Sequence, residues 1–172
     1  MKRTISVLLE NRYGAFNRVS TLFSGKGFNI HSISIGETEM PDIARMTLVT
    51  SGDDKMMDQI LKQLNRLIDT LKVVDLSRVN TVTRELALIS VSYKKGNRAE
   101  ITSLASMFKG KVVDITNRTI TFELTGPPDK IDAAVNMLLP YGIIEVARTG
   151  TVALRRGEQV KLTPQQSESK GE

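Results

Sequence analysis

The hydrophobic pattern of residues 2–77 switches between the two-residue period of strands and the 3.6-residue period of helices. It predicts, in chain order, a strand at 2–10, a helix at 15–25, strands at 28–36 and 44–51, a helix at 52–69 and a strand at 71–77. The apolar face of the first helix comprises Phe16, Val19, Leu22 and Phe23, and that of the second comprises Met57, Ile60, Leu61, Leu64 and Ile68.

Two local features refine these elements. The apolar parity of the second strand shifts between Ile30 and Ile33, which predicts a β-bulge or bend near His31 and Ser32. An aspartate, at position 53 or 54, precedes the second helix and should accept a hydrogen bond from its first turn.

The second half of the chain repeats this order of elements. It predicts strands at 84–93, 111–116, 118–126 and 143–154, with helices within 94–108 and 127–142. The fold class is therefore α+β, as two tandem ferredoxin-like βαββαβ sandwiches. We expect domains at 1–80 and 81–158, and a disordered tail at 159–172, which has almost no apolar residue.

Each predicted half has four antiparallel strands with two helices on one face, so its other face and its edge strands remain available. Exposed edges and faces of such small units are often closed by another subunit. We therefore expect a homodimer. The alternative is a monomer in which the two halves pack on each other.

Composition excludes several classes of protein. The chain has no Cys and a single His, His31, so thiolate or multi-histidine metal sites are not expected. No apolar run approaches the roughly 20 residues that span a bilayer, and the first residues lack a signal-peptide core, so we expect no membrane association and a cytoplasmic location. The net charge of +5 is spread over both halves, and aromatic residues are only 5% of the chain, which disfavours nucleic-acid binding.

No catalytic constellation is evident. The carboxylate pairs Asp53/Asp54 and Glu37/Glu39 fall at a helix cap and in a turn. Acylphosphatase chemistry occurs on this fold and uses an Arg and an Asn, which Arg12 and Asn29 could imitate, but the loop here has one Gly and lacks a phosphate cradle. We predict no catalytic residue and no metal ligand.

The start of the first helix is the strongest candidate for a binding site. Helix N-termini leave N–H groups unpaired and carry partial positive charge, and Gly14 would let a ligand carboxylate approach the backbone. Asn11 and Asn29 could add amide contacts, and Ile30 could pack against an aliphatic side chain. From the residues alone, a second interpretation stays open, in which Asn11 caps the helix and Gly14 serves the turn.

The stretch "ISVLLENRYGAFNRVSTLFSGKGFNIHSISIG", with "DIARMTLVT", "QILKQLNRLIDTLKVVDL" and "IIEVARTGTVALRRG", resembles an ACT domain. It is similar to the regulatory (small) subunit family of acetohydroxyacid synthase, also called acetolactate synthase, from residue 2 to about residue 158. The resemblance implies a non-catalytic subunit that activates a thiamine-diphosphate-dependent catalytic large subunit and confers feedback inhibition by valine or another branched-chain amino acid.

The resemblance also implies which residues bind the effector and where the cofactors reside. Family ligand contacts match at Asn11, Gly14, Ala15, Asn29 and Ile30, and we add the neighbouring Phe16 and His31 to the expected site. No cofactor is expected in this chain, whereas thiamine diphosphate, FAD and Mg are expected in the catalytic partner. Arg12-Tyr13 and Phe16 depart from the residues common in the family, which bears on effector preference. The alternative function is an amino-acid-sensing ACT regulator of a different enzyme.

Overall fold

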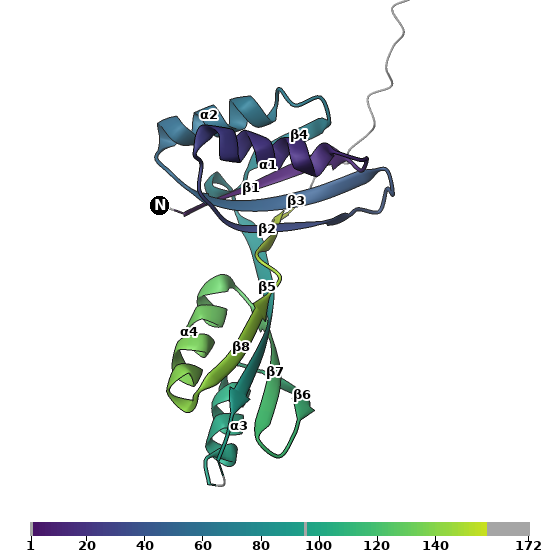
Figure 1. Ribbon diagram of the computed structural model, residues 1–172. Coiled ribbons are helices and arrows are strands. Elements are labelled where there is room, and N and C mark those ends of the chain that lie inside the picture. The colour runs from purple at the N-terminus through teal and green to yellow at the C-terminus, as the bar shows by residue number, and fades with distance from the viewer. Residues whose placement is uncertain (1, 95, 158–172) are drawn as a thin grey trace, which may run out of the picture.

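The computed structural model describes residues 2–94 and 96–157, so the predicted tail at 159–172 lies outside the described residues. It contains two lobes, each with one antiparallel sheet and two helices on one face (Figure 1). This α+β arrangement of two successive βαββαβ units confirms the predicted fold class.

The first lobe has the strand order β2-β3-β1-β4, so that β2 and β4 are its edges. Its elements are β1 (Lys2–Glu10), α1 (Ala15–Lys26), β2 (Ile30–Glu37), β3 (Ile43–Ser51), α2 (Asp54–Leu64), β4 (Thr70–Asp75) and the short 3-10 helix η1 (Leu76–Arg78). Alternate residues of β1 and β3 pack against both helices, in a core of Ile5, Val7, Leu9, Val19, Phe23, Met46, Leu48, Met57, Ile60 and Leu64.

The second lobe has the strand order β6-β7-β5-β8, and β9 pairs with the first residues of β5. Its elements are β5 (Thr81–Ser92), α3 (Arg98–Met107), β6 (Lys111–Ile115), β7 (Thr119–Gly126), α4 (Pro128–Leu138), the 3-10 helix η2 (Leu139–Tyr141), β8 (Ile143–Arg148) and β9 (Val152–Arg155). The core comprises Ala87, Ile89, Val91, Ile101, Ala105, Ile120, Phe122, Leu124, Ile131, Ala134 and Leu138.

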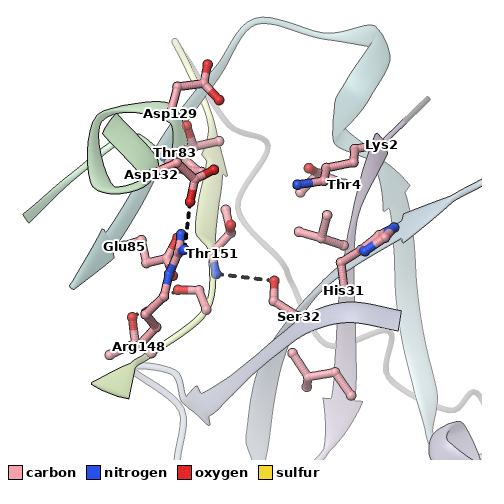
Figure 2. Close-up of a pocket in the computed structure, with 15 residues that line it drawn as sticks. Lys2, Thr4, His31, Ser32, Thr83, Glu85, Asp129, Asp132, Arg148 and Thr151 are labelled. Atoms are coloured by element: carbon pink, nitrogen blue, oxygen red, sulfur yellow. Dashed lines mark hydrogen bonds and ion pairs between the residues drawn. The ribbon is translucent and has the colours of Figure 1, made fainter. Parts of the chain in front are cut away.

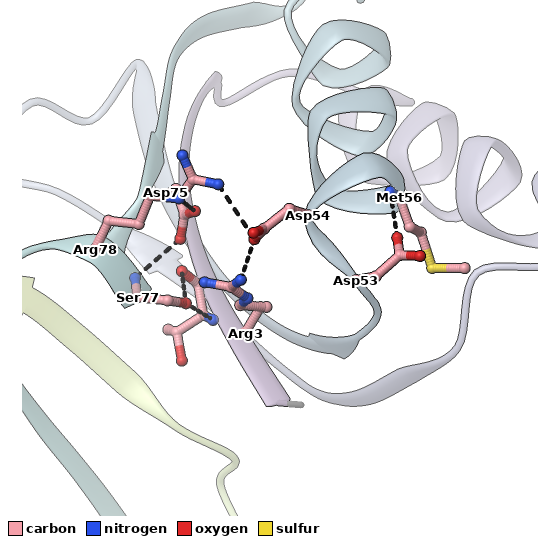
Figure 3. A network of polar contacts seen from close by, with 8 residues as sticks. Arg3, Asp53, Asp54, Met56, Asp75, Ser77 and Arg78 are labelled. Carbon is pink, nitrogen blue, oxygen red and sulfur yellow. Dashed lines mark hydrogen bonds and ion pairs between the residues drawn. The ribbon is translucent and has the colours of Figure 1, made fainter.

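Two predicted local features are confirmed. The β2–β3 register shifts between Ile30 and Ser32, which places a bulge at His31. The Asp53 side chain accepts a hydrogen bond from the backbone N–H of Met56 at 2.8 Å and so caps α2. Asp54, beside it, pairs with Arg3 of β1 and Arg78 of η1 (Figure 3). These ion pairs attach the start of α2 to the sheet.

Two predictions about the helices of the first lobe are wrong, one on where α2 ends and one on the buried face of α1. Helix α2 ends at Leu64 rather than at residue 69, because the Asn65 side chain donates to the Leu61 carbonyl at 2.8 Å and the chain then turns into β4. Ile68 consequently lies outside the helix and is 77% exposed. On α1 the buried row recurs every four residues at Ala15, Val19 and Phe23, which leaves Phe16 on the flank and 45% exposed.

The last predicted strand is in fact two strands. Residues 149–151 separate β8 from β9, because Gly150 has a φ of 77° that turns the chain out of the second sheet. Strand β9 then contacts β1 and η1 of the first lobe. There it lies near the sheet face opposite the helices, where Ser6, Thr47 and Val49 are buried. The chain thus returns to the first lobe to cover part of its open face.

Candidate functional site

The connection from β1 to α1 leaves the N-terminus of the helix open. Gly14 occupies the N-cap position with a left-handed φ of 86°, and no side chain of the described residues accepts a hydrogen bond there. The first backbone bond of the helix runs from the N–H of Arg18 to the carbonyl of Gly14 at 3.1 Å. Among the described residues, the N–H groups of Phe16 and Asn17 have no acceptor, so two donors point out of the helix end.

Asn11 does not cap this helix, so the interpretation of Asn11 as an N-terminal cap is wrong. Its side-chain amide donates instead to the Pro41 carbonyl at 2.8 Å and to Glu37 Oε1 at 3.2 Å. Its backbone N–H donates to the carbonyl of Asp42 at 2.7 Å. Asn11 therefore fixes the β1–α1 connection against the β2–β3 turn.

Two arginines lie beside the open helix end, both paired with Asp69, and Arg12 pairs with Glu10 as well. Arg18 Nε donates to Asp69 Oδ2 at 2.6 Å, and Arg12 Nε donates to Asp69 Oδ1 at 2.9 Å. Arg18 Nη1 lies 3.5 Å from the position that a Cβ on residue 14 would occupy. The hydrogen bond from Arg18 is the main cause of a lowered pKa of the Asp69 carboxyl, Arg12 lowers it further, and desolvation opposes both.

Sequence reasoning missed Arg18 and Asp69 as parts of this site. Arg18 lies four residues after Gly14, and this spacing places a side chain over the first helical turn. The position of Arg18 beside Gly14 could therefore have been predicted from the sequence. Asp69 gave no comparable signal, because 51 residues separate it from Arg18 and no local pattern marks such a pair.

The other predicted effector residues lie at the opposite end of α1. Asn29 and His31 are exposed, Ile30 is half-buried, and all three follow the C-cap Gly27. The Asn29 carbonyl accepts a hydrogen bond from Thr50 Oγ1 at 2.5 Å, which holds the start of β2 on β3.

The single chain therefore divides the predicted site into two groups. Gly14, Ala15 and Phe16 begin α1, whereas Asn29, Ile30 and His31 follow its end. Because α1 has 12 residues, about 18 Å of helix separates the groups. Asn11, paired with Glu37, lies at the far end of β2 from Asn29. One copy of the chain does not bring these groups around one small ligand.

Other classes of site receive no support from the described part of the chain. Within residues 2–94 and 96–157, no group of three or more His, Cys, Asp or Glu side chains could hold a metal ion. No helix in these ranges is long and apolar enough to cross a membrane.

Comparison with known protein families gives two matches that together span most of the chain. Residues 5–72 match the model of an AHAS small subunit-like ACT domain. Residues 84–157 match the model described as the small subunit of acetolactate synthase. The two matched ranges correspond to the two lobes.

Individual relatives agree with these matches. The chain is 49% identical over 162 residues to the acetolactate synthase small subunit of Aquifex aeolicus, covering 93% of this chain and 84% of the relative. It is 42% identical over 164 residues to the acetolactate synthase small subunit of Bacillus subtilis, covering 95% of each. A crystal structure of the acetolactate synthase small subunit from Thermotoga maritima superposes with a TM-score of 0.83 at 37% identity, covering 92% of this chain and 99% of that one.

Proposed function

The chain belongs to the family of acetolactate synthase small subunits, regulatory subunits that contain an ACT domain, and we propose that it activates the catalytic subunit and confers feedback inhibition by valine. The observation that carries the proposal is the open N-terminus of α1. Two backbone N–H groups, of Phe16 and Asn17, lack acceptors in the described residues, and the Arg18 guanidinium lies beside Gly14. Such an end suits a carboxylate, which every amino acid carries.

The effector binds between two copies of the chain. Gly14 and Ala15 of one copy receive the carboxylate of valine, while Asn29 and Ile30 of the other contact its ammonium and aliphatic groups. This arrangement is supported by the separation of the two groups across α1 in a single chain and by the edge position of β2, which exposes backbone donors and acceptors for pairing. A two-fold axis then creates two equivalent sites per homodimer.

The remaining predicted residues have supporting roles. Asn11 holds the β1–α1 connection in place through Pro41 and Glu37. Phe16 and His31 are exposed on either side of the proposed interface, where they would contact the second copy. Residues 1–80 bind the effector, and residues 81–158 tune sensitivity and assembly.

The chemistry of acetolactate formation resides in the catalytic subunit, in the cytoplasm. There thiamine diphosphate, FAD and Mg serve the reaction, and this chain contributes no cofactor ligand. The second candidate is an amino-acid-sensing ACT regulator of a different enzyme. Such a regulator would have the same effector site and would differ only in the enzyme that it regulates.

Reconstitution distinguishes these possibilities. The purified chain is added to an acetolactate synthase catalytic subunit, and acetolactate formation from pyruvate is measured with and without valine. We expect no turnover by the chain alone, a higher rate for the mixture than for the catalytic subunit alone, and loss of that rate as valine is added. Valine binding without any effect on the catalytic subunit would favour the different client, and turnover by the chain alone would refute the regulatory role.

A further inference from the structure

The turn between β8 and β9 touches β2 directly after the proposed effector residues. Gly150 approaches so closely that a Cβ on it would lie 3.1 Å from the Ile33 carbonyl oxygen and 3.2 Å from Ser32 Cβ. The neighbouring N–H of Thr151 faces Ser32 Oγ at 3.5 Å (Figure 2). A side chain at this position would be crowded by the contact and would strain the backbone, because the φ is 77°.

The turn is fixed to the second lobe on its other side. Thr149 and Leu86 exchange hydrogen bonds, from Thr149 N–H to the Leu86 carbonyl and from Leu86 N–H to Thr149 Oγ1, each at 3.1 Å. Arg148 forms two hydrogen bonds to Glu85, at 2.6 and 2.9 Å, and a third to Asp132 of α4 at 2.6 Å. A displacement of the turn therefore moves β5 and α4 with it.

The β2 side of the contact is the irregular part of that strand. The bulge at His31 lies between Ile30, in the proposed effector site, and Ser32, under the turn. The bulge leaves His31 without a ladder partner and disrupts the ladder locally, so fewer ladder hydrogen bonds resist a displacement of β2 between Ile30 and Ser32.

The space beside the turn would accommodate such a movement. A cleft of about 610 Å³ separates the lobes there (Figure 2). One wall carries Lys2, Thr4 and His31 of the first lobe, and the other carries Thr83, Asp129 and Asp132 of the second. The lobes touch at this turn and where β9 contacts β1 and η1, and they part at the cleft, so a rotation that opens or closes the cleft would pivot about these two contacts.

We propose that the Thr149–Thr151 turn transmits effector binding from β2 to the second lobe, through the contact of Gly150 with Ser32 and Ile33. This inference rests on the proposed function, because it needs an effector at Asn29 and Ile30. Binding there shifts Ser32 and Ile33, the turn follows, and the second lobe changes its orientation. The turn contacts β2, which carries part of the effector site, but it does not contact the ligand. It should therefore affect inhibition by valine more than the affinity for valine.

The variant Gly150→Ala tests this role, and Gly157→Ala is its matched control. Gly157 also has a left-handed φ, of 93°, but among the described residues other than its chain neighbours no atom lies within 4 Å of its Cβ position. Both variants therefore bear similar backbone strain, and only Gly150→Ala pushes on β2. Valine binding to the full chain is measured by calorimetry, and valine inhibition is measured in the enzyme reconstituted with the catalytic subunit.

For Gly150→Ala we expect a dissociation constant for valine within about threefold of the wild-type value. The valine concentration for half inhibition should rise by about tenfold or more, which is the size of a typical allosteric coupling. Gly157→Ala should match wild type in both measurements. Wild-type inhibition of folded Gly150→Ala would overturn the inference, and so would loss of valine binding, because the turn would then only support the site. Absence of valine binding and inhibition in the wild-type chain would instead refute the proposed function.

A second measurement needs no variant and applies even if Gly150→Ala fails to fold. Hydrogen exchange of the wild-type backbone at residues 149–151 is followed in the full chain with and without saturating valine. We expect the exchange rate at Thr151 to change when valine binds. Unchanged exchange at all three residues, with altered exchange at residues 29–31, would overturn the inference while leaving the effector site intact.

Discussion

Arg18 donates from Nε to Oδ2 of Asp69 at 2.6 Å, and this ion pair holds a guanidinium beside the open start of α1. The Asp69 side chain is 1% exposed, so its position is fixed by the fold, and it aligns Arg12 as well. Arg12 also pairs with Glu10, so the two arginines are balanced by two carboxylates, and the excess of positive charge around Gly14 is the partial charge of the helix end. A ligand carboxylate would offset that excess.

The first prediction is that Gly14→Asp abolishes valine inhibition and spares activation. The new carboxylate occupies the place of the ligand's own and satisfies the same N–H groups. Half inhibition should need at least about a hundredfold more valine, as loss of roughly 3 kcal/mol of charge-assisted hydrogen bonding implies. The comparison is with Gly14→Ala, which has the same strained φ of 86° and no charge.

Gly14→Ala should weaken inhibition less than Gly14→Asp does, since it adds bulk without a competing carboxylate. Asn29→Ala, at the opposite end of α1, should also weaken inhibition while activation is kept. Each variant is titrated with valine in the reconstituted enzyme, after circular dichroism shows that it is folded. A folded, activating Gly14→Asp variant that is inhibited at the wild-type concentration would show that the proposed site is wrong.

A second prediction concerns pH. Arg18, and then Arg12, lower the pKa of Asp69 in the folded chain, so Asp69 stabilises the fold fully above its unfolded pKa of about 4. This contribution is lost as pH falls through the lowered pKa. Asp69 should therefore cause no change in stability between pH 5 and 8. Denaturation midpoints of wild type and Asp69→Asn should differ by a constant amount in that window and converge in acid.

Replacement of Asp69 should also change the inhibition by valine. Without the carboxylate, Arg18 is no longer held beside Gly14, so Asp69→Asn should raise the valine concentration for half inhibition. Asp58→Asn, an exposed change on α2 that also removes one negative charge, is the control for net charge. Equal inhibition of the Asp69→Asn and Asp58→Asn enzymes would contradict the role given to Asp69.

The sequence predicted what local patterns determine. Periodicity located both βαββαβ units, the parity shift located the bulge at His31, and the aspartate before α2 located its cap. Interactions between distant residues could not be predicted in this way. The pairing of Arg18 with Asp69 and the return of β9 to the first lobe depend on how the units assemble, and one glycine, Gly150, turns what looked like a continuous strand.

A third prediction separates the two partners of Arg148. Glu85 is 5% exposed and Asp132 is 46% exposed at the side chain. Arg148→Ala leaves the buried Glu85 carboxylate unpaired, which should cost about 3 kcal/mol of unfolding free energy. Asp132→Asn removes an exposed partner and should cost about 0.5 kcal/mol. Urea unfolding of both variants measures the difference, and equal losses would contradict the assignment of Glu85 as the principal partner.

A fourth prediction concerns the division between the lobes. A chain that ends at Asn80 should still bind valine if it remains dimeric, and should activate the catalytic subunit less fully. It should also be less stable, because it loses the Thr149–Thr151 turn beside Val49 and strand β9 beside Thr47 on the open sheet face, and one buried aliphatic side chain is worth about 1.5–3 kcal/mol. The control ends at Gly157 and keeps β9. A folded, dimeric 1–80 chain without valine binding would show that the second lobe contributes to the site.

The last prediction follows from placing valine between two subunits. Dissociation constants from millimolar to about ten micromolar correspond to binding free energies of roughly −4 to −7 kcal/mol. A ligand as small as valine reaches such values only when it is well buried and its charges are paired. One open helix end provides the charge without the burial. Two copies that met along α1 and β2 would provide both, because the start of α1 in one copy would then face Asn29 and Ile30 of the other.

Linkage makes this placement measurable. If both sites exist only in the dimer, free valine at about 100 times its dissociation constant strengthens dimerisation by about 10⁴-fold, since each site contributes a factor of about 100. Sedimentation of dilute chain should therefore show monomer converting to dimer as valine is added, and Gly14→Asp should not respond. A dimer dissociation constant that stays the same in saturating valine would mean that each chain binds its effector alone, and the shared site would be wrong.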